Sequence, residues 1–313
     1  MLRLILTRLV FMALAIFTVL TALFFGVRLG RGDPTIAIQG TYATAESLAR
    51  LSEALGLDKP LWRQYLIYLE HLSRGDLSLS IQNGQPVLDQ ILQVAPYTFD
   101  LTVSGLIIGL VLGVPLGFLA AVRRNAIPDH LIRFVTLSGI SIPPFIMGYL
   151  LIIVFVVGLG LLPVAGGGNL GDAGDRLRHL VMPALSLGLI MTSYITRLTR
   201  TTVLEILSRD FVRTGRAKGL SQRVILTRYV LRLSLVTIVT LVGLYATITV
   251  GSSVVIEVVF SRPGVGQLIV GAITQSDYPV VQGAVIFYAA FVCLVNLLVD
   301  VTYALIDPRI SYA

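Results

Sequence analysis

Six long stretches of this 313-residue chain contain no Asp, Glu, Lys or Arg. They span residues 9–27, 101–122, 134–171, 179–196, 233–256 and 278–299. Because a helix needs about 20 apolar residues to cross roughly 30 Å of hydrocarbon, five of these stretches fit one helix each. The longest, 134–171, ends in a Pro- and Gly-rich segment, so its helix is expected at about 134–158. The sequence therefore predicts an all-α polytopic membrane protein with six transmembrane helices.

The first apolar stretch has two interpretations. Arg3 and Arg8 precede it, as basic residues precede the apolar core of a secretory signal peptide. Its apolar run is long for such a core, and no small-x-small cleavage site precedes Arg28. We therefore favour an uncleaved transmembrane helix.

The basic residues are distributed unevenly between the loops. The segment 197–232 holds nine Lys and Arg residues, whereas the short loops 159–179 and 258–280 hold two and one. The segment 28–98 holds six, but long loops cross the membrane largely regardless of charge. The positive-inside rule therefore places both termini in the cytoplasm. This asymmetry explains the net charge of +7 more simply than nucleic-acid binding does in a chain that is 55% hydrophobic.

The segment 28–98 has the composition of a small soluble region. Leu48, Leu51 and Leu55 recur at helical spacing and predict one short helix. The stretch PVLDQILQVAP predicts another short helix, which ends at Pro96.

A further helix is expected between these two, in DKPLWRQYLIYLEHLSRG. Asp58 can cap it and Pro60 suits its first turn. Its apolar side consists of Leu61, Tyr65, Tyr68, Leu69 and Leu72. The three helices would form a small cap that is too small to bury much core alone, so we expect it to pack on the membrane spans.

The sequence lacks the common catalytic motifs. The two lysines, Lys59 and Lys218, do not stand in G-x-x-x-x-G-K-[ST], so the chain is not expected to bind ATP through a Walker A loop. The chain has no G-x-S-x-G, H-E-x-x-H or CxxC motif, its single cysteine excludes an intrachain disulfide, and its three histidines lie far apart. We therefore expect neither an enzyme nor a metal site. The clearest intramembrane acid, Asp300, lies near the end of its span, which disfavours a proton-coupled carrier.

The stretch DFVRTGRAKGLSQRVILTRYVLR, residues 210–232, holds six of the 24 basic residues. Ser208 or Asp210 could cap a helix of about two turns, and Gly219 could end it. Ser221 could then cap a second helix that leads into the next span. The apolar face of this second helix would consist of Val224, Ile225, Tyr229 and Val230. The pattern predicts helix–Gly–helix at the membrane surface.

Two interpretations of this basic loop compete. Its arginines can be membrane anchors that reach anionic headgroups. Alternatively, a short capped helix presents one exposed aromatic side chain, Phe211, to a cytoplasmic partner. Membrane topology needs only a few charges and no helix broken by Gly, so the pattern favours a docking element.

The loop and its approach, RLTRTTVLEILSRDFVRTGRAKGLSQRVILTRYVLR, closely resemble the signature of permease subunits of ATP-binding cassette (ABC) importers. The dipeptide/oligopeptide–nickel branch is the most similar, with a pattern of roughly D-Y/F-V-R-T-A-R-A-K-G-L. Gly215 departs from the usual Ala, and Gly costs about 1 kcal/mol relative to Ala inside a helix. The resemblance implies an ATPase-docking coupling helix made of Asp210, Phe211, Val212, Arg213, Thr214, Arg216, Ala217, Lys218 and Gly219.

The resemblance extends over nearly the whole chain. Further matching segments are GDP at 32–34, LGLDKPLWRQY at 55–65, RGDLSLS at 74–80, PYTFDL at 96–101, EVVFSRPGVGQL at 257–268, DYPVVQG at 277–283 and NLLVDVTYALIDPRI at 296–310. The external segment is similar to that of the B-type permease of a pair. The family implies the type I ABC importer permease fold, with residues 1–27 as N-terminus and first span, 28–98 as a periplasmic helical insertion, and 99–313 as the permease core.

The family also implies partners and a location. A second permease subunit would form a heterodimer with this chain in the lipid of the bacterial inner membrane. Two cytoplasmic ATP-binding subunits would hold ATP and Mg, so this chain needs no cofactor of its own. A periplasmic or lipid-anchored substrate-binding protein would deliver the cargo. Family frequency favours di- and oligopeptides, with glutathione, opine-like compounds, nickel complexes and some sugars as alternatives.

Two groups of residues are candidates for the translocation path. Ser138, Ser141 and Pro143, followed by Pro144, interrupt the third span, where a packing kink is the alternative explanation. In the fifth span the candidates are Tyr245, Thr247 and Thr249. Small residues such as Gly243 beside them more commonly serve contacts between helices.

Two hypotheses from other classes remain. The chain could be a self-sufficient carrier or channel, which the docking loop argues against. It could also be a membrane scaffold or sensor, which the interrupted third span argues against weakly. Purification separates the three, because only the importer hypothesis requires a second permease and two ATPases to co-elute.

Overall fold

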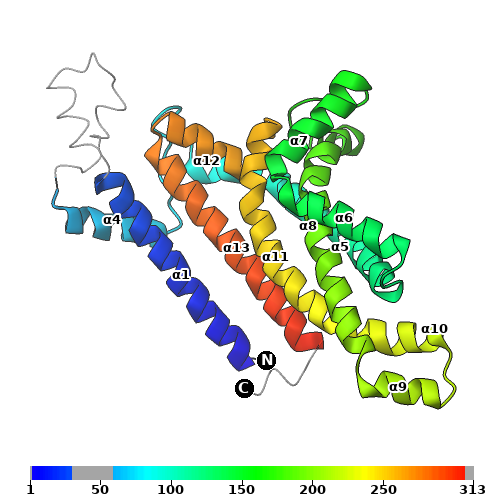
Figure 1. Cartoon of the computed structure of the whole chain (residues 1–313). Helices are drawn as coiled ribbons and strands as arrows, with labels where there is room; N and C mark the ends of the chain where they lie inside the picture. Colours follow the sequence, from blue (N-terminus) through cyan, green and yellow to red (C-terminus); the bar gives the residue numbers. More distant parts are fainter. Residues whose placement is uncertain (1, 30–58, 307–313) are drawn as a thin grey trace. The chain divides into compact units, whose positions relative to one another are not determined.

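The computed structural model describes residues 2–29 and 59–306, and these are helical apart from loops and one antiparallel bridge between Leu79 and Pro86. Helices occupy all six uncharged stretches, apart from the Pro- and Gly-rich end of the longest one at residues 159–171 (Figure 1). The helices are α1 (Leu2–Leu29), α4 (Leu61–Ser73), α5 (Val87–Val122), α6 (Ile127–Ser141), α7 (Pro144–Ile152), α8 (Ala173–Leu207), α9 (Asp210–Ala217), α10 (Gln222–Val224), α11 (Leu231–Val259), α12 (Val265–Thr274) and α13 (Tyr278–Ile306). Two π-helical segments, η2 (Ile153–Gly158) and η3 (Ile225–Val230), follow α7 and α10.

Four of the described helices, α1, α5, α8 and α13, are long and apolar enough to cross a membrane. Helix α6 and the α7–η2 helix form a bent pair, and this pair is a fifth span if the two helices together cross the membrane once. In α11, the apolar helical segment found among the described residues is Tyr245–Val259, which is too short to cross a membrane alone. The all-α, multi-pass prediction is confirmed, and the sixth span stays a prediction.

The third predicted span is not one straight helix. Its two halves meet at an angle of 102°. Ile142 between them is extended, with φ −90° and ψ 119°, because a residue before proline avoids the helical region. Pro143 and Pro144 also lack the N–H groups that would continue the helix. The predicted interruption by these prolines is confirmed, and it is a sharp bend.

The chain divides into two compact units, which are described separately below. Of the described residues, the first unit contains 2–6, 97–262 and 294–306, and the second contains 7–29, 59–96 and 263–293. The segments predicted from sequence, 1–27, 28–98 and 99–313, follow other boundaries and stay a prediction.

In the first unit, four glycines spaced one helical turn apart let α5 approach α8. They are Gly105, Gly109, Gly113 and Gly117. A methyl group on Gly109 would lie 2.6 Å from Cβ of Met191, and one on Gly117 would lie 2.5 Å from the backbone oxygen of Thr196. Such distances are too short for carbon, so this helix contact requires glycine. We call these four residues the α5 glycine row.

Buried apolar side chains fill the space around this contact. One cluster joins α5, α8 and α11 through Leu101, Met182, Leu187, Ile256 and Phe260. A second joins α8 and α11 through Met191, Ile195, Ile238 and Val242. Helix α8 contacts α6, α7 and α11 and is therefore the central helix of the first unit.

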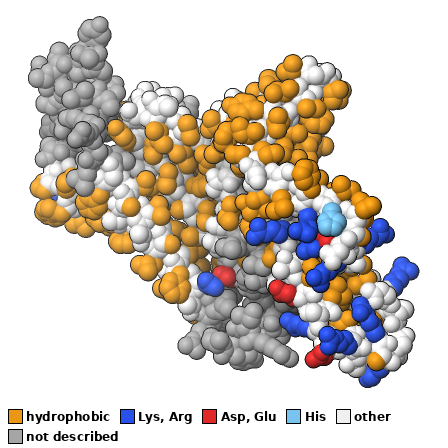
Figure 2. Space-filling view, viewed as in Figure 1, with side chains coloured by type: hydrophobic (Ala, Val, Ile, Leu, Met, Phe, Trp, Pro, Cys, Tyr) orange, Lys and Arg blue, Asp and Glu red, His pale blue; other side chains and the backbone are white. Residues whose placement is uncertain are grey.

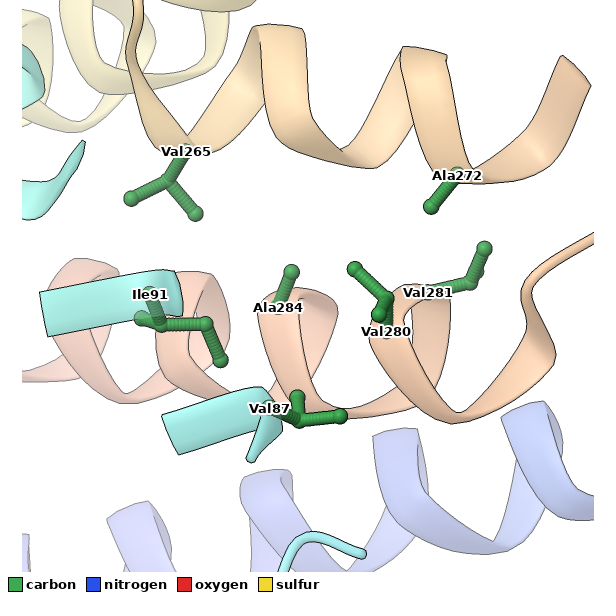
Figure 3. Packing of buried hydrophobic residues seen from close by; sticks show 7 residues of the cluster. All are labelled: Val87, Ile91, Val265, Ala272, Val280, Val281 and Ala284. Carbon is green, nitrogen blue, oxygen red and sulfur yellow. The ribbon is translucent and has the colours of Figure 1, made fainter. Parts of the chain in front are cut away.

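In the second unit, the start of α5 packs on α12 and α13. Figure 3 shows the cluster, which consists of Val87, Ile91, Val265, Ala272, Val280, Val281 and Ala284. A polar contact lies beside it, where Ser80 donates a hydrogen bond of 2.5 Å to the Asp277 carboxylate. Both residues are buried, so this bond ties the segment before α5 to the turn between α12 and α13.

Helix α4 packs on α1, also within the second unit. The hydroxyls of Tyr65 and Thr21 lie 2.6 Å apart, and Phe24 is fully buried with its ring 5.1 Å from that of Tyr65 and 5.3 Å from that of Tyr68. The predicted apolar side of α4 is thus confirmed for the two tyrosines, whereas Leu61 is 43% exposed. The helix expected around residues 44–56 and the Asp58 cap lie outside the described residues.

The predicted helix end at Pro96 is wrong, because α5 runs without a break from Val87 to Val122. An internal proline removes one backbone hydrogen bond and costs about 3 kcal/mol. Burial on both sides of it offsets that cost, since Val87, Ile91 and Leu101 are all fully buried.

Replacing Gly117 with Ala should destabilise the first unit, because the neighbouring atoms of Thr196 are backbone and cannot turn aside. Overpacking of this kind costs about 1–3 kcal/mol. Thermal unfolding of the detergent-solubilised, assembled protein would measure the loss. Gly251→Ala in α11 is the matched control, since a methyl group there meets nothing within 4 Å. Equal unfolding temperatures for the two variants would contradict the requirement for close contact.

Candidate functional site

In the basic loop 197–232, residues 197–207 continue α8, and the rest forms two short helical segments at one end of the first unit before α11 begins (Figure 1). Helix α9 spans Asp210–Ala217, and the chain then turns at Gly219, whose φ is +78°. Helix α10 and the π-helical η3 follow and lead into α11. The predicted helix–Gly–helix arrangement is thus present, because Gly tolerates the left-handed conformation that ends α9.

The caps of the loop are only partly as predicted. Ser221 caps the second helix as expected, with its hydroxyl accepting from the Val224 N–H at 3.4 Å. The N-cap of α9 is Arg209, which is extended and offers no side-chain cap, so the prediction of Ser208 or Asp210 is wrong. Ser208 instead closes α8, where its hydroxyl donates to the Glu205 carbonyl at 2.7 Å, and Asp210 lies in the first turn of α9.

Helix α9 is held to the first unit by one inward side chain. Val212 is 1% exposed and belongs to a buried cluster with Ala121, Val203, Ile206, Ile225 and Val230. The predicted apolar face of the second helix is half right, because Ile225 and Val230 are buried whereas Val224 and Tyr229 are not.

The other predicted docking residues of α9 and its end point outward. They are Asp210, Phe211, Arg213, Thr214, Arg216, Ala217, Lys218 and Gly219. Phe211 is 37% exposed, directly beside buried Val212. Asp210 pairs weakly with Arg213 at 3.7 Å, and Figure 2 shows Lys and Arg side chains over this end of the unit. The surface of α9 therefore combines one aromatic ring with mostly positive charge.

The departure at Gly215 has little steric cause. A methyl group there would lie 3.6 Å from the Leu220 side chain and 3.7 Å from Ile225, which are ordinary contacts. The position could hold the alanine that is usual in the resembling family.

The predicted path residues lie in two separate places. Ser138, Ser141 and Pro143 are exposed, around the bend between α6 and α7. In the part of the chain that the structure describes, no hydrogen bond joins them to the second group, which lies on α11 and comprises Tyr245, Thr247 and Thr249.

The α11 group is partly committed to contacts within the first unit. The Tyr245 ring stacks on Tyr194 with centroids 5.0 Å apart, and Thr247 donates to the Asn296 amide oxygen. Thr249 is 2% exposed and donates to the Tyr245 carbonyl at 2.9 Å.

Gly243, beside the α11 group, serves a helix contact. A methyl group on it would lie 1.9 Å from a methyl carbon of Val299 in α13. Asp300, one residue further along α13, is half-buried.

Sequence reasoning missed a charged cluster in the first unit. Arg176 donates to Asp100 at 2.6 Å, and Thr98 donates to the buried Glu257 at 2.7 Å. Arg262 is fully buried, with Nη2 3.6 Å from Asp100 and the guanidinium 5.3 Å from the centre of the Tyr97 ring.

Burial lowers the pKa of the Arg262 guanidinium, and the nearby carboxylates oppose that shift. Arg262 follows the end of α11 and, through Asp100 and Arg176, joins the ends of α5, α8 and α11. The sequence held one hint of this cluster, because Asp100 directly precedes the uncharged stretch 101–122 and Glu257 directly follows the stretch 233–256.

Comparison with known proteins covers both halves of the chain. Residues 113–312 match the family described as binding-protein-dependent transport system inner membrane component. Residues 1–102 match the N-terminal family of such membrane components. The glutathione transport system permease protein GsiC of Escherichia coli strain K12 is 37% identical over 312 residues, which is 100% of both chains. GsiC of Shigella flexneri serotype 5b is 36% identical with the same coverage.

Solved structures agree in fold. The chain is similar to two crystal forms of the inward-facing MetNI methionine ABC transporter, with TM-scores of 0.58 and 0.57 and identities of 20% and 21%. Each match covers 70% of this chain and 97% or 96% of the other. The predicted resemblance is confirmed, and the hypotheses of a self-sufficient carrier and of a scaffold lose their support. The chain belongs to the family of binding-protein-dependent inner-membrane transport components, as a multi-pass permease subunit of an ABC importer.

Proposed function

We propose that this subunit forms half of a translocation path for small peptides, with glutathione as the first cargo to test. Support comes from relatives of the same length at 37% identity whose names specify glutathione transport. The predicted spans contain long stretches without charged residues, so a cargo can pass along the path without being bound tightly by charged side chains.

The proposed assembly is a heterodimer with a second permease. Two ATP-binding subunits hold the nucleotide and Mg, and a periplasmic or lipid-anchored binding protein brings the cargo. The uneven distribution of Lys and Arg supports cytoplasmic termini and a cytoplasmic position for the loop 197–232.

The coupling proposal depends on one observation: in α9, Val212 is buried and its neighbour Phe211 is exposed. Val212 fixes α9 to the buried cluster that it shares with the end of α8 and with η3, so a displacement of α9 displaces these elements. Phe211, the preceding residue, is exposed and can enter an apolar pocket on an ATPase subunit.

The basic residues of α9 tune this docking rather than hold it. Exposed ion pairs contribute roughly 0–1 kcal/mol each, whereas a buried aromatic anchor contributes about 2 kcal/mol or more. Arg213, Arg216 and Lys218 can pair with acidic residues of the ATPase and orient it.

Replacing Phe211 with Asp should uncouple the transporter while the permease still inserts and folds, because the ring is not part of the core. We expect co-purification of the ATPase subunits to fall at least roughly tenfold and cargo uptake to fall with it. Tyr229→Asp is the matched control, another exposed aromatic of the same loop that lies outside α9. Normal uptake and co-purification with Phe211→Asp would overturn the docking role.

The two glycines of the coupling loop should respond oppositely to alanine. Gly215→Ala should stabilise α9 by up to about 1 kcal/mol, since the methyl group fits and alanine favours the helix. Gly219→Ala should destabilise the turn by roughly 1 kcal/mol, because its φ of +78° suits glycine. Hydrogen exchange of the α9 backbone amides would measure both effects. Parallel shifts in the two variants would refute this assignment.

Cargo can be tested on the intact importer reconstituted with its cognate binding protein. We expect glutathione to stabilise the binding protein thermally and to drive ATP-dependent uptake. Di- and tripeptides without a γ-glutamyl linkage serve as comparison ligands. Stabilisation and uptake by nickel complexes or opine-like compounds alone would exclude a peptide cargo while leaving the permease role and the docking loop untouched.

A further inference from the structure

Helices α6 and α8 of the first unit line a cavity of about 200 Å³, away from α9. Arg133, Arg197 and Arg200 line it together with Thr196 and the apolar Ile132 and Leu137. The space is far larger than the roughly 10–15 Å³ that one water molecule requires. Its lining is both basic and apolar.

The cavity carries uncompensated positive charge. Arg200 is neutralised by Asp129, which accepts from Arg200 Nε at 2.7 Å and from Nη2 at 2.8 Å and is itself fully buried. Arg133 and Arg197 are exposed, and the described residues give neither of them an ion-pair partner. Two guanidinium groups are therefore available to an anion.

A buried hydroxyl also lacks a partner there. Thr196 is 1% exposed, and its Oγ1 makes no hydrogen bond with any described residue. The neighbouring Thr136 uses its hydroxyl on the Ile132 carbonyl at 2.8 Å, and Thr201 uses its own on the Arg197 carbonyl at 3.1 Å. Buried polar atoms are rarely left unpaired, so the Thr196 hydroxyl indicates an acceptor that enters the cavity from outside this chain.

The surroundings favour an amphiphilic ligand over a soluble one. Five apolar residues of α6 are more than half exposed, among them Leu131 at 60%, Phe134 at 72% and Val135 at 65%. Figure 2 shows basic and hydrophobic side chains adjoining on the visible face of the molecule. Basic pockets between membrane helices suit anionic headgroups, with the acyl chains along the apolar helix surface.

We propose that this cavity binds the phosphate group of an anionic phospholipid. Arg133 and Arg197 pair with the phosphate, the Thr196 hydroxyl donates to one of its oxygens, and the acyl chains lie along α6. The Arg200–Asp129 pair keeps the rear wall neutral, so a single anion suffices.

The test uses the assembled transporter, with its partner permease and ATPases, purified from membranes that contain phosphatidylglycerol and cardiolipin. After extensive detergent washing, native mass spectrometry counts the retained anionic phospholipid. We expect one bound lipid per copy of this chain. The double variant Arg133→Gln, Arg197→Gln should lower its occupancy at least roughly tenfold, since each basic residue near an anionic headgroup contributes roughly fivefold.

Two further variants separate the site from general charge and from folding. Arg123→Gln, Arg124→Gln removes the same charge from the exposed turn before α6, away from the cavity lining, and should keep the lipid. Thr196→Val keeps all charges and nearly the same volume and should lower occupancy a few-fold. Size-exclusion chromatography and thermal unfolding verify that each variant assembles.

Three results would overturn the proposal. Equal lipid loss in both double variants would reveal non-specific attraction to basic residues. Absence of lipid from the washed parent complex would mean that another subunit covers the cavity. Thermal stabilisation by inorganic phosphate that requires Arg133 and Arg197, without retained lipid, would identify a soluble anion instead.

Discussion

The close approach of α5 and α8 is the constraint on which the rest of the first unit depends. In lipid, helices gain little from the hydrophobic effect, and their association relies on close packing. The α5 glycine row removes the side chains that would hold the two backbones apart. Helix α8 is thereby fixed, and it in turn contacts α6, α7 and α11 and leads directly to the docking loop.

The packing of α5 on α8 also fixes the position of α9 in the proposed docking loop. The buried cluster around Val212 contains residues of α5, α8, α9 and η3, so α9 is not an independent appendage. The proposed docking to an ATPase subunit requires such an attachment, because an exposed two-turn helix alone would yield locally. The same short helix exposes its aromatic and basic side chains on the other side, which separates the attachment from the contact.

The sequence predicted the features that follow from local chemistry. Uncharged stretches became helices, the left-handed turn fell on Gly219, Ser221 capped its helix, and the paired prolines bent the third span. It failed where distant parts of the chain decide the outcome. Helix α5 continued through Pro96 because the side chains on either side of that residue are buried, which no local pattern shows.

Contacts between residues far apart in the chain could not be predicted from the sequence either. Asp100 and Arg176 pair across 76 positions, and the glycines of α5 recur every fourth residue without revealing which helix they face. Arg209 rather than Ser208 begins α9 because Ser208 still has the helical conformation of α8. The docking role of these residues stays a prediction, and only packing could separate inward Val212 from its outward neighbours.

The π-helical segment η3 affects how far α9 is rotated around the axis of α11, the span that follows it. A π-helical turn closes hydrogen bonds over five residues rather than four, so it contains one residue more than an α-helical turn. One residue corresponds to about 100° of rotation around a helix axis. The direction in which the docking surface faces, relative to α11, is therefore encoded in the length of the chain at η3 as well as in the identity of its side chains.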